Sequence, residues 1–588
     1  MRRYRCTVHN IELEKNFCDE CGSRENVESI SDIYYCAKCN VPLYEQACPV
    51  CHTEGRRIAS DLRPVFPKER LLYEILEGEP LKYINSSVWN ASGNYYLIDG
   101  VLKRFNVAQL VRLSDEDIVR IRESLDEYEE QNKNNRFEEY VSRFIECNNS
   151  RYDEITQEAL NYIREVSAEY DVKDMFVSFS GGKDSTVTSD LVMRALSNPK
   201  ILHIFGDTTL EFPKTEEYVG RFKKSHPMTP VISSRNREKD FSQLCDMIGP
   251  PSRVMRWCCT IFKTGAINRK LTALFKDKTS ILAFYGIRRS ESASRSKYDR
   301  ETQGRKISRQ NTVSPAIDWM DFDVWLYILK RKIDFNEAYT YGYARVGCFC
   351  CPNNSVWSEF LSKIYMPEQY GRWLEFLIDF AKRIGKPDAE EYVRSGKWKA
   401  RQGGNGIAYA DNAVVSFKPC ALEENSFNYE LLKPIDNELY ELFKPFGYLD
   451  FNMGNPRLGE VYVLNRRGAA VLRLQGRKGG KHLKVTILDY HIDRAKTVEA
   501  AEEKVKCQLT KYQLCMGCRA CEGVCRHGAI RLESMPDGGS RYHIDDDKCI
   551  RCAQCVNHFN SGCYMKKVLA VERGEGGKIK KGGVGGGG

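Results

Sequence analysis

Cysteine is the residue type whose spacing in this sequence most clearly indicates chemistry. The chain has 24 cysteines among 588 residues. Seven lie at or before Cys51 and nine lie between Cys507 and Cys563, and pairs separated by two residues recur in both blocks. Close pairs of thiols are typical of metal sites in chains without an export signal, whereas disulfide frameworks belong to secreted chains. Both blocks are therefore predicted to bind metal.

The first block has the ligand pattern of structural zinc sites. Its donors divide into two sets of four, the number that tetrahedral zinc requires, and the pattern resembles tandem zinc ribbons. The predicted ligands are Cys6, His9, Cys18 and Cys21 for one ion and Cys36, Cys39, Cys48 and Cys51 for the other. Four protein ligands leave no position for a substrate, so a structural or partner-binding role is expected. Buried free thiols are the alternative interpretation.

The second block reads C-x2-C-x2-C-x3-C from Cys515 to Cys525 and C-x2-C-x2-C-x7-C from Cys549 to Cys563. This spacing resembles that of bacterial ferredoxins, which bind two [4Fe–4S] clusters. In that family the fourth cysteine of each run ligates the other cluster. The resemblance implies one cluster on Cys515, Cys518, Cys521 and Cys563 and another on Cys549, Cys552, Cys555 and Cys525. Arg526 stands where such domains usually have proline, which is a minor departure. Zinc at these positions is the weaker alternative.

A glycine-containing run between a predicted strand and a predicted helix indicates phosphate binding. Residues 178–186 read SFSGGKDST. Two glycines let the backbone close around a phosphate, and the helix that follows supplies free N–H groups and a positive dipole. A lysine adds a point charge and two hydroxyl side chains add donors. The run is not a Walker A loop, which requires G-x-x-x-x-G-K-[ST].

This run resembles the PP-loop of the N-type ATP pyrophosphatases and of the sulfonucleotide (phosphoadenosine phosphosulfate, PAPS, and adenosine phosphosulfate, APS) reductases. Two further segments, 207–215 and 286–295, are similar to the family's D-T-x-x-x-F-P-x-T and G-x-R-x-x-E-S stretches. The resemblance implies an adenine nucleotide, ATP or PAPS/APS, with Mg²⁺ as a candidate companion ion. It implies nucleotide-binding roles for Ser180, Gly181, Gly182, Lys183, Asp184, Ser185, Thr186, Asp207, Thr208 and Arg295, and catalytic roles for Lys183, Asp184, Arg288 and Arg289. Arginines suit such a site because their planar fork binds an oxyanion bidentately.

Four further cysteines suggest a third iron–sulfur cluster. Cys258 and Cys259 are adjacent, and Cys348 and Cys351 follow as a C-x-x-C pair. This arrangement resembles the CC…CxxC set that holds a [4Fe–4S] cluster in APS reductases. A zinc site and plain buried thiols remain alternatives.

Composition and hydrophobic patterning indicate a multidomain globular chain. At roughly 150 residues per domain, 588 residues suggest about four domains. Residues are 42% hydrophobic and 29% charged, and 89 basic against 80 acidic side chains give a net charge of +9. No apolar run is long enough to cross a membrane, and MRRYRCTVHN lacks the apolar core of a secretory signal, so a cytoplasmic protein without membrane contact is expected.

The apolar segments around the phosphate loop predict the fold class. Short strands (MFVSF, ILHIFGD, TPVISS and ILAFYGI) alternate with helical segments, which is typical of a doubly wound parallel sheet. The resemblance implies an adenine nucleotide α-hydrolase-like fold. The expected domains are zinc ribbons at 1–55, a small mixed α/β region at 56–150, the PP-loop domain at 151–395, a basic β-rich domain at 396–503, a ferredoxin-like α+β domain at 504–570 and a disordered Gly-rich tail at 571–588.

These features favour an enzyme that couples a nucleotide to redox-dependent sulfur chemistry, with an electron donor as partner. One version reduces PAPS or APS and releases sulfite. The other adenylates a substrate with ATP and then transfers sulfur; the intact SGGKDS favours it, as does the absence from this sequence of the reductases' E-C-G-x-H motif. A third possibility is a redox-sensing nucleic-acid-binding or nucleic-acid-thiolating protein. It would use the zinc ribbons and the basic stretch 466–484, which has seven Lys or Arg and no acidic residue.

Overall fold

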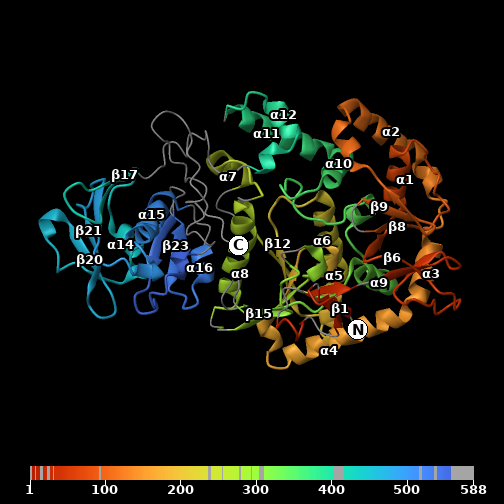
Figure 1. Ribbon diagram of the computed structural model, residues 1–588, viewed down its shortest axis with the longest axis horizontal. Coiled ribbons are helices and arrows are strands. Elements are labelled where there is room, and N and C mark those ends of the chain that lie inside the picture. The colour runs from red at the N-terminus through yellow and green to blue at the C-terminus, as the bar shows by residue number, and fades with distance from the viewer. Residues whose placement is uncertain are drawn as a thin grey trace. The chain divides into compact units, whose positions relative to one another are not determined.

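The computed structural model describes most of the chain, and the described residues divide into two compact units. The first takes those of segments 1–233, 277–303 and 310–373, and the second takes those of 234–276 and 374–588. Figure 1 shows the elements of each unit. The described residues are 3–6, 8–13, 17–22, 27–30, 32–91, 94–235, 240–253, 256–276, 278, 280–292, 295–303, 310–383, 385–400, 416–515, 520–534 and 540–557.

The first unit is built on a six-stranded sheet of order β13-β12-β11-β14-β16-β15. β11 pairs in parallel with β12 and β14, β14 pairs in parallel with β16, and only the edge strand β15 is antiparallel to β16 among these pairs. The four strands predicted from apolar runs are present as β11 to β14, so the doubly wound α/β fold is confirmed. The strands are β11 (Met175–Phe179), β12 (Leu202–Gly206), β13 (Val231–Ser234), β14 (Ile281–Tyr285), β15 (Glu301–Gln303) and β16 (Gln310–Val313).

Helices cover this sheet through two apolar clusters. Helices α4 (Asn149–Ser167), α5 (Lys183–Ala195) and α9 (Asp321–Arg331) share one buried core with β11 and β14. The amphipathic helix predicted from about 152 to 169 is α4, and its apolar stripe lies in this core. Tyr218, Val219 and Phe222 of α6 (Pro213–Ser225) form a second cluster with Phe179 and Phe205. The sheet is therefore held by packing that brings α5 and α9 together beside it.

Three smaller sheets precede the large one. Two are three-stranded, of orders β2-β1-β3 and β5-β4-β6, and the third is four-stranded, of order β10-β9-β8-β7. Their strands are β1 (Arg3–Cys6), β2 (Glu12–Leu13), β3 (Val27–Ile30), β4 (Ile33–Cys36), β5 (Val41–Leu43), β6 (Arg56–Ala59), β7 (Leu62–Pro64), β8 (Val88–Ala91), β9 (Tyr95–Ile98) and β10 (Val101–Arg104). Helices α1 (Pro67–Leu76), α2 (Asp115–Asn132) and α3 (Phe137–Cys147) follow or interleave with them, and α10 (Val356–Tyr365) and α11 (Pro367–Arg383) come after the large sheet.

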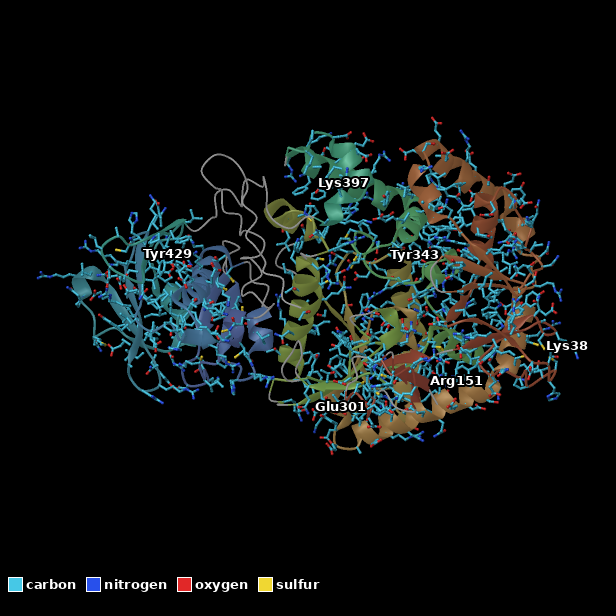
Figure 2. The ribbon with its side chains drawn as sticks, in the orientation of Figure 1. Lys38, Arg151, Glu301, Tyr343, Lys397 and Tyr429 are labelled. Carbon is cyan, nitrogen blue, oxygen red and sulfur yellow. The ribbon has the colours of Figure 1, made fainter. Side chains whose placement is uncertain are left out.

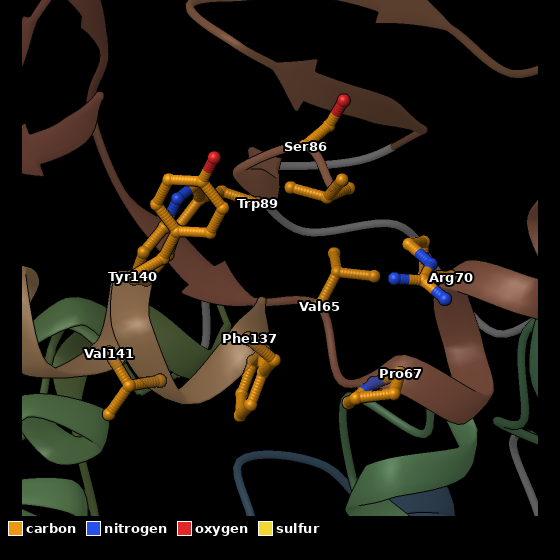
Figure 3. Close-up of a pocket in the computed structure, with 9 residues that line it drawn as sticks. Val65, Pro67, Arg70, Ser86, Trp89, Phe137, Tyr140 and Val141 are labelled. Atoms are coloured by element: carbon orange, nitrogen blue, oxygen red, sulfur yellow. The ribbon is translucent and has the colours of Figure 1, made fainter. Parts of the chain in front are cut away.

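A small cavity lies among these N-terminal elements (Figure 3). It is lined mainly by apolar side chains, among them Val65, Trp89 and Phe137, and it has a volume of about 20 Å³. A cavity of this size holds on the order of one water molecule. It is therefore a packing defect and no nucleotide site.

The second unit contains an antiparallel sheet of order β17-β18-β22-β21-β20-β19 and a two-stranded hairpin, β23-β24. The predicted β-rich segments VYVLN, AAVLRL and LKVTIL correspond to β20, β21 and β22. Its elements are α7 (Phe241–Ile248), a π-helical turn (Cys259–Gly265), α8 (Ala266–Leu274), α12 (Ala389–Arg394), β17 (Ser416–Pro419), β18 (Ser426–Glu430), α14 (Asn437–Glu441), β19 (Tyr448–Asp450), β20 (Glu460–Leu464), β21 (Ala470–Gln475), β22 (His482–Ile487), α15 (Val498–Leu514), α16 (Ala520–Val524), β23 (Ile530–Ser534), β24 (Ser540–Ile544) and α17 (Gln554–Asn557).

Several expectations concern residues outside the described set. These are the ligands Cys518 and Cys563, the Gly-rich start of the predicted β-rich domain at 401–406, and the tail 571–588. The domain boundaries inferred from the sequence stay predictions. Among the described helices, none is long and apolar enough to cross a membrane.

Candidate functional site

The chain order of the large sheet predicts where a ligand would bind. The strands progress outward from β11 through β12 to β13, and the chain then returns to place β14 on the other side of β11. Loops that leave β11 and β14 therefore diverge at their carboxyl ends, and such a switch point is where open α/β sheets bind ligands. Segment 180–186 after β11 consists of the loop 180–182 and the first turn of α5, and the loop after β14 begins at Gly286. The predicted nucleotide segments at 180–186 and 286–295 thus emerge at the switch point.

Two glycines allow these loops to pack closely. Gly181 has φ +70°, and a Cβ there would lie 2.9 Å from Cγ2 of Thr215. A Cβ at Gly286 would lie 2.6 Å from the carbonyl oxygen of Asp184 and 2.7 Å from the amide nitrogen of Ser185. Backbone cannot move aside as a flexible side chain can, so glycine is required at 286. The two loops form one surface around the first turn of α5.

The first turn of α5 is held by a buried ionic cluster. Lys183 is 4% exposed, and its Nζ lies 3.2 Å from both Asp184 Oδ2 and Asp321 Oδ1. Arg288 is 3% exposed and donates through Nε to Asp184 Oδ1 at 2.5 Å and through NH2 to Asp321 Oδ1 at 2.7 Å. The Lys183 amide also donates to the Tyr339 hydroxyl at 2.9 Å. Two cations and two carboxylates therefore cross-link the starts of α5 and α9 and the loop after β14.

The charges in this cluster keep each other ionised. Burial alone would raise the pKa of Asp321, but Lys183 and Arg288 outweigh burial and hold that pKa below its ordinary value. Burial alone would lower the pKa of Lys183, but Asp184 and Asp321 raise it above its ordinary value. Opposite charges at these distances favour the charged forms of both partners. The phosphate loop thus contains permanent charges rather than a proton-exchanging group.

The turn after β12 brings a cysteine to the predicted nucleotide segment. Asp207 Oδ1 accepts the Thr209 N–H at 3.0 Å, and the Thr208 hydroxyl donates to Glu211 Oε1 at 2.6 Å. The Thr208 Oγ1 also lies 3.6 Å from Cys348 Sγ, and Glu211 forms a β-bridge with Cys348. Thr209 has φ +64°, a strained conformation for a β-branched residue. Such strain is common at functional sites, and here it accompanies the approach of the C-x-x-C segment.

The other predicted anion-binding arginines have carboxylate partners. Arg289 donates to Asp318 Oδ1 at 2.5 Å and to the Tyr298 carbonyl at 2.9 Å. Arg295 forms an ion pair with Glu291. Arg288 is directed at Asp184 and Asp321, as described above. Direct contact between these arginines and a ligand stays a prediction, since each guanidinium already binds a carboxylate of the chain.

Both N-terminal donor sets converge as zinc would require. Within each predicted set the four ligand atoms lie within 4.8 Å of one another. Cys36 and Cys51 have their sulfurs 3.3 Å apart, and Cys39 and Cys48 have theirs 3.7 Å apart. Four sulfurs at about 2.3 Å from one zinc ion would be about 3.8 Å apart, so the residues fit the metal. The sulfur of Cys147, a buried residue at the end of α3, also lies 3.7 Å from the sulfur of Cys48.

The C-terminal block gathers one of its predicted ligand sets around a hollow. A mainly apolar cavity of about 20 Å³ is lined by the whole crossed set for one cluster, Cys525, Cys549, Cys552 and Cys555. Thiols from two distant runs thus line one mainly apolar hollow, as the crossed ligand set implied by the ferredoxin resemblance requires. Of the other set, Cys515 and Cys521 are described. The exact ligand assignments stay predictions.

Comparison with known families agrees with this geometry. Residues 174–354 match the phosphoadenosine phosphosulfate reductase domain, and residues 514–558 match the 4Fe-4S dicluster domain. The chain contains a PAPS reductase domain. That domain spans β11, the phosphate loop, the loop after β14 and the C-x-x-C pair. The 4Fe-4S dicluster match and the two converging donor sets support the iron–sulfur and zinc-binding character expected from the cysteine blocks.

The relatives of the PAPS reductase domain are only partly similar to the whole chain. Two uncharacterized proteins of Methanocaldococcus jannaschii are 29% and 30% identical to 45% of this chain, which covers 53% and 62% of their lengths. The chain thus spans less than two thirds of these relatives. An adenosine 5'-phosphosulfate reductase of Anoxybacillus flavithermus is 28% identical over 34% of this chain and 79% of that protein. A solved PAPS reductase of Candida auris, in a phosphate complex, is 15% identical over 34% of this chain and 93% of that one, with a TM-score of 0.26.

The predicted third cluster stays a prediction from the sequence. Cys348 and Cys351 belong to the first unit, and Cys258 and Cys259 belong to the second. Cys348 and Cys351 are partly exposed at the turn described above, and Cys258 and Cys259 are partly exposed at the π-helical turn. Each pair is thus accessible within its own unit.

The basic stretch 466–484 does not form one surface along the chain. Arg466 and Arg467 lie in the turn before β21, and Arg477 lies in the turn after it, so these charges are at opposite ends of one strand. Arg473 and Lys484 both bind Glu423. Nucleic-acid binding by this stretch stays a prediction without a geometric argument in its favour.

Sequence reasoning missed two carboxylates of the phosphate-loop cluster. Asp321 belongs to none of the motifs described above, although it is the first residue of α9. Asp61 lies far outside the PAPS reductase domain, and its side chain reaches the same helix end. Of these two residues, Asp61 lacked any signal in the sequence, because its role depends on packing between segments about 260 residues apart.

Proposed function

We propose that the chain is an iron–sulfur enzyme that binds an adenylyl sulfate on loop 180–186 and reduces it to sulfite and AMP. In this reaction the S–O bond to the phosphate breaks, sulfur gains two electrons, and two protons enter the products. The observation that carries the proposal is the contact of Cys348 with Thr208. A redox-capable sulfur ligand thereby adjoins the segment that the resemblance assigns to the nucleotide.

The charges at the switch point suit an anionic nucleotide. The N-terminus of α5 supplies a positive dipole and backbone N–H groups; its N-cap residue, Gly182, has no side chain to cap them, and the Lys183 N–H donates to the Tyr339 hydroxyl. Lys183 and Arg288 lie directly beneath this turn. Preorganised donors of this kind are typically worth a few kcal/mol each when negative charge develops on a leaving phosphate. We assign this stabilising role to the α5 N-terminus together with Lys183.

The iron–sulfur domain would supply electrons for the sulfur step. Its contribution is one-electron transfer, for which four-iron clusters are suited. The residues of the PAPS reductase domain would bind and orient the nucleotide and stabilise the departing phosphate. An external electron donor is required by the balance of the reaction.

A second candidate is adenylation-dependent sulfur transfer, in which ATP is cleaved to AMP and pyrophosphate. The intact SGGKDS sequence favours it, and the positive φ of Gly181 followed at once by the N-terminus of α5 is compatible with phosphate binding. In that case a substrate would be adenylated before it receives sulfur, and Mg²⁺ would accompany the ATP. Both candidates use the same loop.

One experiment separates the candidates. Protein reconstituted anaerobically with iron, sulfide and zinc is incubated separately with APS, PAPS and ATP in the presence of a low-potential reductant. Sulfite from APS or PAPS supports reduction, and pyrophosphate from ATP supports adenylation. Lys183→Ala should remove either product, whereas Lys173→Ala, which removes a 69% exposed lysine side chain, is the matched control and should keep it. Neither product from the wild-type protein would contradict both candidates.

A further inference from the structure

Asp61 contacts the phosphate-loop cluster from outside the PAPS reductase domain. Its Oδ2 accepts the N–H of Asp321 at 3.0 Å and its Oδ1 accepts the N–H of Phe322 at 3.1 Å. The same Oδ1 accepts the N–H of Leu62 at 2.8 Å. Three backbone hydrogen bonds therefore fix this carboxylate at the N-terminus of α9.

The N-terminus of α9 needs such a partner. The first N–H groups of any helix have no acceptor within the helix, and a carboxylate there gains both hydrogen bonds and a favourable interaction with the helix dipole. Met320, the residue at the N-cap position, provides no side-chain cap bond to these groups. Within α9 itself, Asp323 Oδ2 accepts the Met320 N–H at 3.0 Å, and Asp61 supplies from a distant segment the acceptors for the Asp321 and Phe322 N–H groups.

The turn that Asp61 holds carries the carboxylate that organises the phosphate loop. Asp321 Oδ1 lies 3.2 Å from Lys183 Nζ and accepts from Arg288 at 2.7 Å. Arg288 in turn holds Asp184 in the first turn of α5. Displacement of the Asp321 backbone by even a fraction of an ångström would change both ion pairs, because each depends on the position of one oxygen.

We propose that Asp61 is a positioning residue for nucleotide binding: it fixes the first turn of α9 and, through Asp321, the positions of Lys183 and Arg288 beneath the phosphate loop. This inference rests on the proposed nucleotide site at residues 180–186. Asp61 itself would not touch the nucleotide.

The position of Asp61 in the chain connects its contact with α9 to the predicted zinc-binding region. Only Ser60 and Asp61 separate β6 from β7. Strand β6 pairs with β4, which ends at the zinc ligand Cys36. The phosphate loop is therefore connected to the second zinc ribbon through a short, hydrogen-bonded path, and the N-terminal region completes the binding site of the PAPS reductase domain.

The charge state of Asp61 should make the affinity for APS depend on pH, which a purely structural role of this residue would not do. Burial and the neighbouring Asp321 carboxylate raise the pKa of Asp61 to about 7, while the Arg288 guanidinium acts in the opposite direction. Loss of the Asp61 proton adds a negative charge beside Asp321 and opposes an anionic ligand. Affinity for APS, whose phosphate and sulfate stay fully ionised, should therefore fall as pH rises from 6 to 8.

The test measures the dissociation constant of APS for the full-length, metal-reconstituted protein without reductant, by calorimetry. Asp61→Ala should weaken binding at pH 6 on the order of tenfold, because the hydrogen bonds that Asp61 accepts from the N-terminus of α9 are lost. Asp61→Asn should bind with an affinity that no longer changes between pH 6 and 8. Asp99→Asn is the matched control. Asp99 also accepts a backbone N–H, from Ser87 at 2.9 Å, but has no contact with α9 among the described hydrogen bonds. The Asp99→Asn protein should therefore bind APS with the wild-type affinity.

A double-mutant cycle tests the route through Asp321. If Asp61 acts through Asp321, adding Asp61→Ala to Asp321→Asn should weaken binding no further, whereas independent effects would add. Additive effects, or wild-type affinity in both Asp61 variants, would overturn the positioning role. Lys183→Ala separates failure of the proposed nucleotide site from failure of the positioning role of Asp61. If the Lys183→Ala protein also binds APS normally, the proposed nucleotide site itself is wrong.

Discussion

The sulfur of Cys348 lies 3.6 Å from the hydroxyl oxygen of Thr208, although 140 residues separate them in the chain. The Phe349 N–H also donates to the Leu210 carbonyl at 3.0 Å, so the two segments are joined by backbone as well. Chemistry at Cys348 would thus take place beside the turn that follows β12. The predicted cluster ligand Cys348 and the predicted nucleotide segment 207–215 thus adjoin within one unit.

Metal analysis should give about two zinc and about twelve iron ions per fully reconstituted chain, from two zinc ribbons and three four-iron clusters. Cys258→Ala should lower iron to about eight because it removes a ligand of the predicted third cluster. Cys420→Ala is the control, because Cys420 belongs to none of the predicted ligand sets. If the wild-type protein contains eight iron ions and Cys258→Ala does not change that number, the prediction of a third cluster is wrong.

Lys183→Ala and Asp184→Ala should abolish nucleotide turnover and leave the metal content unchanged, since the phosphate loop contributes no metal ligand. Product formation and metal content are measured on the same preparations. Unaltered turnover in both variants would show that the active site lies elsewhere.

Arg288→Ala should destabilise the first unit far more than Arg289→Ala does. Arg288 is buried against Asp184 and Asp321, and removal of one partner of a buried ion pair costs about 3–5 kcal/mol because charge is left uncompensated. Asp318, the partner of Arg289, is 36% exposed, so water can replace the arginine and the loss should be about 1 kcal/mol or less. Chemical denaturation of both variants measures the difference. Equal losses would contradict the described cluster.

The stability of the protein should carry a pH dependence that Asp61→Asn removes. The pKa of Asp61 is raised in the folded state to about 7 from an ordinary value of 3.8. A raised carboxyl pKa means that the folded state binds the proton more tightly, so this contribution to stability is complete below pH 4 and is lost as pH rises through about 7. Relative to Asp61→Asn, the wild-type melting temperature should therefore fall between pH 6 and pH 8. A constant difference between the two melting temperatures would be the contrary result.

Cys515→Ser should eliminate electron-dependent product formation and spare nucleotide binding. Cys515 belongs to the predicted cluster set of the ferredoxin-like domain, whereas the phosphate loop lies in the PAPS reductase domain. Product is assayed with a ferredoxin-type donor, and APS affinity is measured separately. Full activity of this variant would mean that electrons enter by another route.

Local patterns in the sequence determined the elements and most of the ligand types. Apolar runs predicted β11 to β14, the spacing of Ile155, Ala159 and Ile163 predicted α4, and paired thiols predicted two zinc sets. These features are readable because strand and helix periodicity and ligand spacing act over a few residues. Arg151, labelled in Figure 2, donates to Asp323, 172 residues further along the chain, and no local pattern specifies such a pairing.

Only the tertiary structure decided which charges meet. Asp61 and Asp321 are 260 residues apart, yet the carboxylate of one caps the helix that begins with the other. The structure likewise placed Lys183 between two carboxylates, and it placed Arg466 and Arg477 in the turns at opposite ends of β21. Contacts of this kind depend on how whole elements pack and on which buried charges must be neutralised, and neither condition leaves a mark in the spacing of neighbouring residues.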